Sequence, residues 1–178
     1  MIDMPDVDRT YDEEIVVAIA PMRPELIESY WQVLDVVARE RKYLAFTQAP
    51  PIEESRRFVL DLLAERSPMV VAFTPGPRVV GWCDIRVPPF DCVRHVGVLG
   101  MGVHPDFRGE GIGHLLLERA LRHARTCRLE KVELTVFASN LIAVKLYEQS
   151  GFEVEGIKRR SYKLDGVYDD VLMMARYF

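Results

Sequence analysis

The chain has 178 residues, about half of them apolar, which is enough for one folded domain with a substantial core. Its net charge of −4 at pH 7 comes without a basic block, which argues against DNA, RNA or an anionic membrane as its partner. No apolar run approaches the roughly 20 residues of a membrane span, and the acidic N-terminus is unlike a signal peptide. We therefore expect a cytoplasmic protein.

The hydrophobic pattern predicts alternating strands and helices after an acidic, aperiodic lead-in at residues 1–14. The predicted strands are residues 15–20, 69–73, 78–87, 95–103, 130–137, 152–164 and 167–177. The predicted helices are residues 25–41 and 52–65, an amphipathic helix that follows the glycines near position 113, and residues 141–150. Asp165-Gly166 is a strong hairpin signal between the last two strands.

These elements predict a mixed α/β fold in a single domain over residues 1–178. Strand-helix units imply parallel neighbours and hairpins imply antiparallel ones, so we expect a twisted, mixed sheet with helices on both faces. Cys83, Cys92 and Cys127 have no Cys-x-x-Cys spacing, which indicates reduced structural thiols. The four histidines lack metal-ligand spacing, and we predict no metal.

The segment from His95 to Leu121 carries the clearest chemical signal, because a strand, a turn, three glycines and a helix follow one another. The first N–H groups of a helix have no partner inside the helix and attract anions, phosphate above all. Gly109, Gly111 and Gly113 remove side chains, so that successive amides can point into one concavity, and Arg108 adds a positive charge. We therefore predict a site for a phosphorylated ligand.

The spacing excludes two common phosphate loops. A dinucleotide loop would need Gly or Ala where counting from Gly109 puts His114, and a nucleotide triphosphate loop needs Gly-Lys before Ser or Thr, which does not occur. The remaining pattern, Arg-x-x-Gly-x-Gly, resembles the acetyl-CoA pyrophosphate loop of the GNAT acyltransferase superfamily. The resemblance implies that the pyrophosphate binds Arg108, Gly109, Gly111, Ile112 and Gly113.

The neighbouring segments extend this resemblance. Gly100 and Gly102 weaken the strand before the loop, which indicates a bulge or the close approach of another group. In GNAT enzymes this strand splays from the next one and its backbone pairs with the pantetheine arm of CoA. By position, the resemblance gives that task to Met101 and Val103.

A second motif lies on the helix predicted at residues 141–150. Asn140 and Tyr147 stand seven residues apart and so share one face, and Gly151 is a plausible end of the helix. In isolation, Asn140 is most simply an N-cap and Tyr147 a half-buried aromatic residue. Their similarity to the GNAT motif implies that Asn140 contacts CoA and that Tyr147 protonates the departing thiolate.

The sequence leaves the general base open. Many GNAT enzymes carry a Glu on the central strand, but residues 95–103 contain no carboxylate. His95, Asp84 and Glu133 remain as alternatives, and so does deprotonation through water alone.

The resemblance implies an acetyl-CoA-dependent N-acetyltransferase that transfers the acetyl group directly to a primary amine. Residues 81–85, 99–103 and 133–136 look most like the branch that acts on free amino acids and related small amines. The alternatives are a ribosomal-protein-like N-terminal acetyltransferase and a sensor that binds acyl-CoA without turnover. Phe46 and Gln48, in the loop between the first two helices, are candidates for substrate contact. Relatives often pair through terminal strands, so we expect a homodimer.

Overall fold

The computed structural model describes residues 16–178, so the predicted lead-in at residues 1–14 lies outside the described residues. Within residues 16–178 the chain forms a seven-stranded sheet in the order β1-β2-β3-β4-β5-β7-β6. The strands are β1 Ala18–Pro21, β2 Met69–Thr74, β3 Arg78–Arg86, β4 Val96–Val103, β5 Lys131–Phe137, β6 Glu153–Leu164 and β7 Val167–Tyr177. β4 and β5 run parallel and the other neighbours antiparallel, which confirms the predicted mixed sheet.

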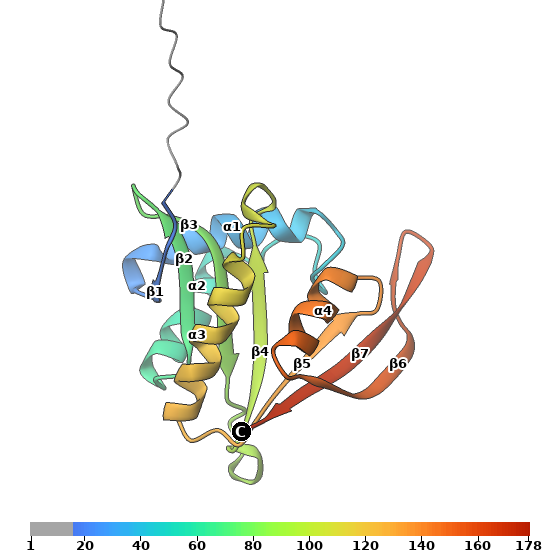
Figure 1. The fold of residues 1–178 in the computed structure, drawn as a ribbon. Helices are drawn as coiled ribbons and strands as arrows, with labels where there is room; N and C mark the ends of the chain where they lie inside the picture. The colour runs from blue at the N-terminus through green and yellow to red at the C-terminus, as the bar shows by residue number, and fades with distance from the viewer. Residues whose placement is uncertain (1–15) are drawn as a thin grey trace, which may run out of the picture.

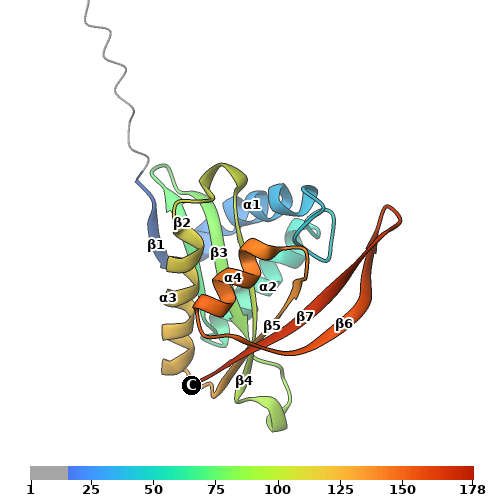
Figure 2. The same ribbon diagram turned by 45° about the vertical axis from the view of Figure 1, so that its right-hand side comes forward.

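Four helices cover the two faces of this sheet, as predicted (Figure 1 and Figure 2). They are α1 Ile27–Arg39, α2 Ile52–Ala64, α3 Ile112–Thr126 and α4 Leu141–Gln149. α1 and α2 bury one core against β2 and β3, and α3 and α4 bury the other against β3, β4 and β5. The seven strands belong to one sheet, and the four α-helices pack on it.

The ends of the elements follow from local backbone chemistry. The helix predicted at residues 25–41 starts with a 3-10 turn at Pro24–Leu26 and stops at Arg39, and Arg41 then takes a left-handed φ of 57° that no helix can continue. Gly151 follows α4 with φ 81°, as expected for a C′ glycine. Asp165 and Gly166 both have positive φ, as a two-residue hairpin turn requires.

β4 splays from β5, which confirms the predicted central strand (Figure 1). The two strands pair only at Val96–Lys131, Gly97–Val132 and Val98–Glu133, and then diverge. The remaining part of β4, up to Val103, keeps its partner on the other side, because the β3–β4 ladder runs on to Gly81–Val103. A gap therefore opens between β4 and β5 toward the end at which α3 begins.

Gly102 of β4 serves close packing, and the bulge named as one alternative is absent. The β3–β4 register is continuous from Arg86–Val98 to Gly81–Val103. A Cβ on Gly102 would overlap the indole ring of Trp82, whereas a Cβ on Gly100 would lie at an ordinary contact distance, 3.4 Å from Asp84 Oδ1. The close approach that the sequence predicted is thus made by a side chain of β3.

Candidate active site

The glycine loop forms an uncapped helix start. Gly109 and Gly111 have φ values of 86° and 77°, a region that favours glycine, and α3 begins directly after them at Ile112. Gly111 is the N-cap, no described side chain caps the amides of the first turn, and that turn contains no acidic residue. Free amides at a helix start, with no acidic side chain beside them, are suited to an anion such as a phosphate group.

Gly113 lies between this loop and the gap in the sheet. A Cβ added there would lie 3.5 Å from Leu146, 3.7 Å from Met101 and 3.8 Å from Val103, which are ordinary contact distances. Internal packing therefore does not demand a glycine at position 113. A ligand that lies against the backbone of α3 would demand one.

The backbone groups of Met101 and Val103 point into the gap between β4 and β5. His104 N donates to Val80 O at 2.8 Å, so Val80–His104 is a hydrogen-bonded pair of the antiparallel β3–β4 ladder. Such pairs alternate with pairs whose backbone groups face outward, and Gly81–Val103 and Cys83–Met101 fall in the second set. Since β5 has diverged by this point, these groups face the gap and can bond to an extended ligand.

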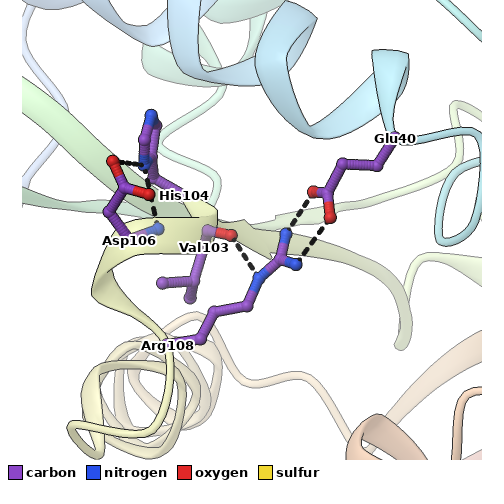
Figure 3. A network of polar contacts seen from close by, with 5 residues as sticks. All are labelled: Glu40, Val103, His104, Asp106 and Arg108. Atoms are coloured by element: carbon purple, nitrogen blue, oxygen red, sulfur yellow. Dashed lines mark hydrogen bonds and ion pairs between the residues drawn. The ribbon is translucent and has the colours of Figure 1, made fainter.

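Arg108 is engaged with the protein on two sides (Figure 3). Its Nε donates to Val103 O at 2.9 Å, and its Nη1 and Nη2 both donate to the carboxylate of Glu40, Nη1 at 2.8 Å. Its guanidinium also lies over the ring of Tyr43, 4.8 Å from the centroid. The sequence predicted a charge offered to a phosphate, and the structure shows a charge paired with Glu40, whose hydrogen bond raises the pKa of Arg108.

Asn140 stands directly before α4, and Tyr147 lies in its second half. Asn140 Oδ1 accepts a hydrogen bond from Ala143 N at 3.3 Å, so Asn140 is an N-cap, and its amide N–H groups can still serve another partner. Tyr147 is buried among the core residues under α4, and burial, with a smaller effect of Cys83, raises its pKa well above the ordinary value. The phenol is therefore protonated at neutral pH, and burial makes it a weaker acid than a free tyrosine.

A cavity of about 380 Å³ lies on the other face of the sheet, between α1, α2, β3 and β4. Aromatic and aliphatic side chains line most of it, and Ser55 and two carboxylates complete it. The described lining residues are Tyr30, Leu34, Leu44, Phe46, Pro50, Glu54, Ser55, Phe58, Trp82, Asp84, Gly100 and Met101. Phe46, a predicted contact residue, is among them, and Gln48 is not. Met101 borders both this cavity and Gly113, so the cavity meets the gap at β4.

Asp84 is the one of the three suggested bases that lines this cavity. It is 6% exposed, and burial raises its pKa to about 7, against the smaller opposing effect of Arg86. His95 is exposed at the start of β4, away from the glycine loop, and Glu133 pairs with Lys131 at 3.3 Å on β5. Sequence reasoning could not rank the three, because only the β3–β4 register brings Asp84 beside Gly100.

A second cavity lies away from most of the predicted site residues. A larger cavity of about 840 Å³ lies between β1 and the outer side of α3, and of the predicted site residues only Ile112 lines it. Within residues 16–178 no cluster of three His, Cys, Asp or Glu side chains could hold a metal ion. No helix in the same residues is long and apolar enough to cross a membrane.

Comparison with known proteins gives a consistent result. The family model described as Acetyltransferase (GNAT) family matches residues 29–152. The L-amino acid N-acetyltransferase AaaT of Escherichia coli (strain K12) is 30% identical over 166 residues, which cover 92% of this chain and 98% of that protein. The N-alpha-acetyltransferase RimI of Mycobacterium tuberculosis is 37% identical over 105 residues, 57% of this chain and 61% of that protein.

Solved structures show the same fold. An acetyltransferase of the GNAT family from Streptococcus pneumoniae has a TM-score of 0.84 and 25% identity, over 92% of this chain and all of that one. The structure of yncA from Salmonella typhimurium, solved with acetyl-CoA, has a TM-score of 0.84 at 17% identity, over 91% and 94% of the two chains. Because the family model matches more than half of the chain, we conclude that the protein belongs to the GNAT acetyltransferase family and is an N-acetyltransferase that uses acetyl-CoA.

Proposed function

We propose that the protein transfers the acetyl group of acetyl-CoA directly to the primary amine of a small molecule, and that the acceptor is an amino acid with an apolar side chain. The observation that carries the proposal is the meeting of the cavity with the gap at Gly100 and Met101. Asp84 stands on the cavity side of the sheet and Tyr147 on the other. One proton acceptor and one proton donor thus flank the place where amine and thioester would meet.

Acetyl-CoA would occupy the gap and the glycine loop. The pyrophosphate would bind the amides of the loop from Arg108 through Gly113, where the helix dipole favours an anion. The pantetheine arm would pair with the outward-facing backbone of Met101 and Val103, while the amide of Asn140 would donate to CoA from the start of α4. At Val103 the carbonyl already accepts from Arg108, which leaves its N–H for the ligand.

The proposed reaction needs no covalent enzyme intermediate. Asp84 takes a proton from the acceptor ammonium, and the free amine attacks the thioester carbonyl carbon. The nitrogen of the tetrahedral adduct, now positively charged, loses a second proton to water as the C–S bond breaks. Tyr147 gives its proton to the departing thiolate and later recovers one from solvent. A base with pKa about 7 is half ionised near neutral pH, and a phenol with a raised pKa still holds its proton there.

The nature of the cavity supports a small apolar acceptor. Eight of the described lining side chains are aromatic, aliphatic, Met or Pro, and a volume of about 380 Å³ is at the lower end of the roughly 300–1,000 Å³ of small-molecule sites. The amino acid acetyltransferase AaaT covers nearly the whole chain at 30% identity. The likeness to RimI keeps a peptide N-terminus as a second candidate, because it too presents a primary amine.

The first test is thermal unfolding with acetyl-CoA, CoA and NADH, because a ligand that binds only the folded state raises the midpoint. We expect a rise with both CoA species and none with NADH. Thiol release with Phe, Met, their amides, and short peptides that begin with Ala would then identify the acceptor. Binding without release from any amine would favour an acyl-CoA sensor, and the absence of any CoA shift would refute the loop assignment.

We also propose a cytoplasmic homodimer. β6 is the last strand of the sheet order, so its outer edge offers backbone groups to a second copy. Val154 and Ile157 are exposed on that strand. Sedimentation at several protein concentrations measures the oligomeric state, and a monomer at all of them would contradict the dimer.

A further inference from the structure

The loop between α1 and α2 forms one wall of the cavity without regular structure of its own. Residues 41–50 contain neither helix nor strand, yet Leu44, Phe46 and Pro50 line the cavity. No backbone ladder fixes this loop. Its position depends on the packing of Leu44 and Ala49 against the core and on the side chains that hold its two ends. We call residues 41–50 the acceptor wall.

The far end of the acceptor wall is tied back to α1. Trp31 Nε1 donates to Pro50 O at 2.7 Å, and Ala49 N donates to Asp35 Oδ1 at 3.0 Å. These two bonds hold the wall only where it enters α2. The near end, directly after α1, needs other contacts.

Two ion pairs hold the near end. Arg41 bonds to both carboxylate oxygens of Asp165 at 2.8 Å, but the side chains are 45% and 74% exposed, and such pairs contribute little in water. In that pair a single nitrogen, Nη2 of Arg41, makes both bonds. Glu40 and Arg108 form a two-nitrogen, bidentate pair whose side chains are 22% and 32% exposed. Bidentate geometry fixes the orientation as well as the distance of the partners, so this pair is the firmer of the two.

The second pair reaches directly into the glycine loop, as Figure 3 shows. Arg108 stands next to Gly109, and its Nε bond to Val103 O also fixes the end of β4. The ring of Tyr43, on the acceptor wall, lies under the same guanidinium. Three parts of the molecule, namely α1 with the wall, the end of β4 and the glycine loop, thus meet at one side chain.

We propose that the Arg108–Glu40 ion pair positions the acceptor wall against the acetyl-CoA loop, so that the Arg108 side chain serves acceptor placement and not pyrophosphate binding. This rests on the proposed function for what the wall contacts. Amine and thioester carbon must come within about 3–3.5 Å of each other, and a misplacement of 1 Å can cost about a hundredfold in rate. Arg108 and Glu40 are positioning residues in this scheme, and neither touches the reacting atoms.

The test uses Glu40→Gln, Arg108→Gln and the double variant that combines these two changes. A fourth variant, Arg41→Gln, removes the exposed ion pair between Arg41 and Asp165. Three quantities are measured: the Kd of CoA by calorimetry, amide hydrogen exchange of residues 41–50, and KM and kcat for the best amine. Arg108→Lys, which keeps the charge but loses the fork geometry, stands in if Arg108→Gln does not fold.

We expect both single variants to speed exchange of residues 41–50 and to raise the acceptor KM about tenfold, with the Kd of CoA within about threefold of the parent. The double variant should be no worse than either single one, because both remove the same pair. Arg41→Gln should speed exchange of residues 41–50 less than either single variant, because the Arg41–Asp165 pair is the more exposed of the two. A loss of CoA affinity above about tenfold in Arg108→Gln alone would overturn the proposal and make Arg108 a phosphate ligand. So would unchanged exchange in both single variants.

Failure of the proposed function is a separate result. If no amine is acetylated, calorimetry and hydrogen exchange still report whether the ion pair holds the wall or the phosphate. An acceptor wall that loosens in both variants without turnover would keep the positioning role and refute the small-amine acceptor.

Discussion

At the scale of single residues, Asp84 is notable because its carboxylate is buried and also lines the acceptor cavity. Asp84 lies on β3 and pairs with Gly100 of β4. In many GNAT enzymes the strand that corresponds to β4 carries a Glu. Burial raises the pKa of Asp84 to about 7, which suits a group that must take a proton from an ammonium near neutral pH. A carboxylate on β3 can therefore replace the one that β4 lacks.

This role predicts a specific pH profile. For the parent, kcat/KM for the acceptor should rise with pH through a midpoint near 7, because only the ionised carboxylate accepts a proton. Asp84→Asn should lower kcat about a hundredfold or more and remove that midpoint, with the Kd of CoA unchanged. Steady-state thiol release from pH 5 to 9 measures both. Retention of the same midpoint in Asp84→Asn would exclude Asp84 as the base.

The proposed role of Tyr147 as the acid predicts a different change in the kinetic constants. Tyr147→Phe keeps the ring that packs against Phe152, with centroids 5.8 Å apart, and removes only the hydroxyl group. We expect kcat to fall about ten- to a hundredfold while the Kd of CoA changes less than threefold, since the proton is needed only as the thiolate leaves. Single-turnover kinetics with calorimetry separates the two, and an unchanged kcat would remove Tyr147 from the mechanism.

Sequence patterns could identify some of these residues but not others. Asn140 and Tyr147 belong to one helix, and the glycines to one loop, so local spacing was enough to find them. The Arg108–Glu40 pair joins residues 68 positions apart, and Asp84 becomes distinct from His95 and Glu133 only through strand register and burial. Such pairings depend on tertiary packing, which a local pattern does not contain.

At the scale of elements, the glycines of β4 and α3 do different work. Gly102 is required by the indole of Trp82, whereas Gly113 has room for a methyl group inside the protein. Gly102→Ala should therefore lower the free energy of unfolding by about 1–3 kcal/mol through overpacking. Gly113→Ala should leave stability nearly unchanged and weaken CoA binding, because the methyl group would meet the ligand.

Urea unfolding and CoA calorimetry on both variants check this pair. The two variants serve as controls for each other, since each should change one quantity and spare the other. Equal CoA affinity in Gly113→Ala and the parent would show that acetyl-CoA does not approach α3 there.

Element positions followed from periodicity and turn chemistry. Pro24, Pro51, Gly151 and Asp165-Gly166 mark boundaries because they restrict φ or tolerate positive φ, and the structure uses each of them as a boundary. For the glycines of β4 the sequence left two alternatives, a bulge or a close approach, because a glycine is needed equally by a bulge and by a bulky neighbour on the next strand. Trp82 is that neighbour, and only the register reveals it.

At the scale of the whole molecule, the burial of Asp84 should lower the free energy of unfolding at neutral pH. Its pKa is 3.8 when unfolded and about 7 when folded, so between these values the folded state holds a proton that the unfolded state has lost. Stability from this group therefore falls as pH rises from about 4 to about 7 and stays low above that range. At pH 8, Asp84→Asn should unfold at a higher temperature than the parent. The corresponding gain in the free energy of unfolding is on the order of a few kcal/mol.

Comparing the two proteins isolates Asp84 from other titrating groups. His104 acts in the opposite sense, because burial lowers its pKa and its contribution to stability is lost as pH falls, but it is present in both proteins. Thermal unfolding at pH 4 and pH 8 is the measurement. A gain in stability that is the same at both pH values would contradict a raised pKa at Asp84.

The three residue pairs between β4 and β5 have a mechanical consequence. They are the described backbone pairing between two parts of the sheet, β1 to β4 and β5 to β7, and they lie at the start of β4. A cosubstrate in the gap would add hydrogen bonds between the two parts of the sheet, and its departure would leave them joined by these three pairs and by the apolar core under α3 and α4. Loading and unloading of CoA would then stiffen and soften the enzyme once in every catalytic cycle.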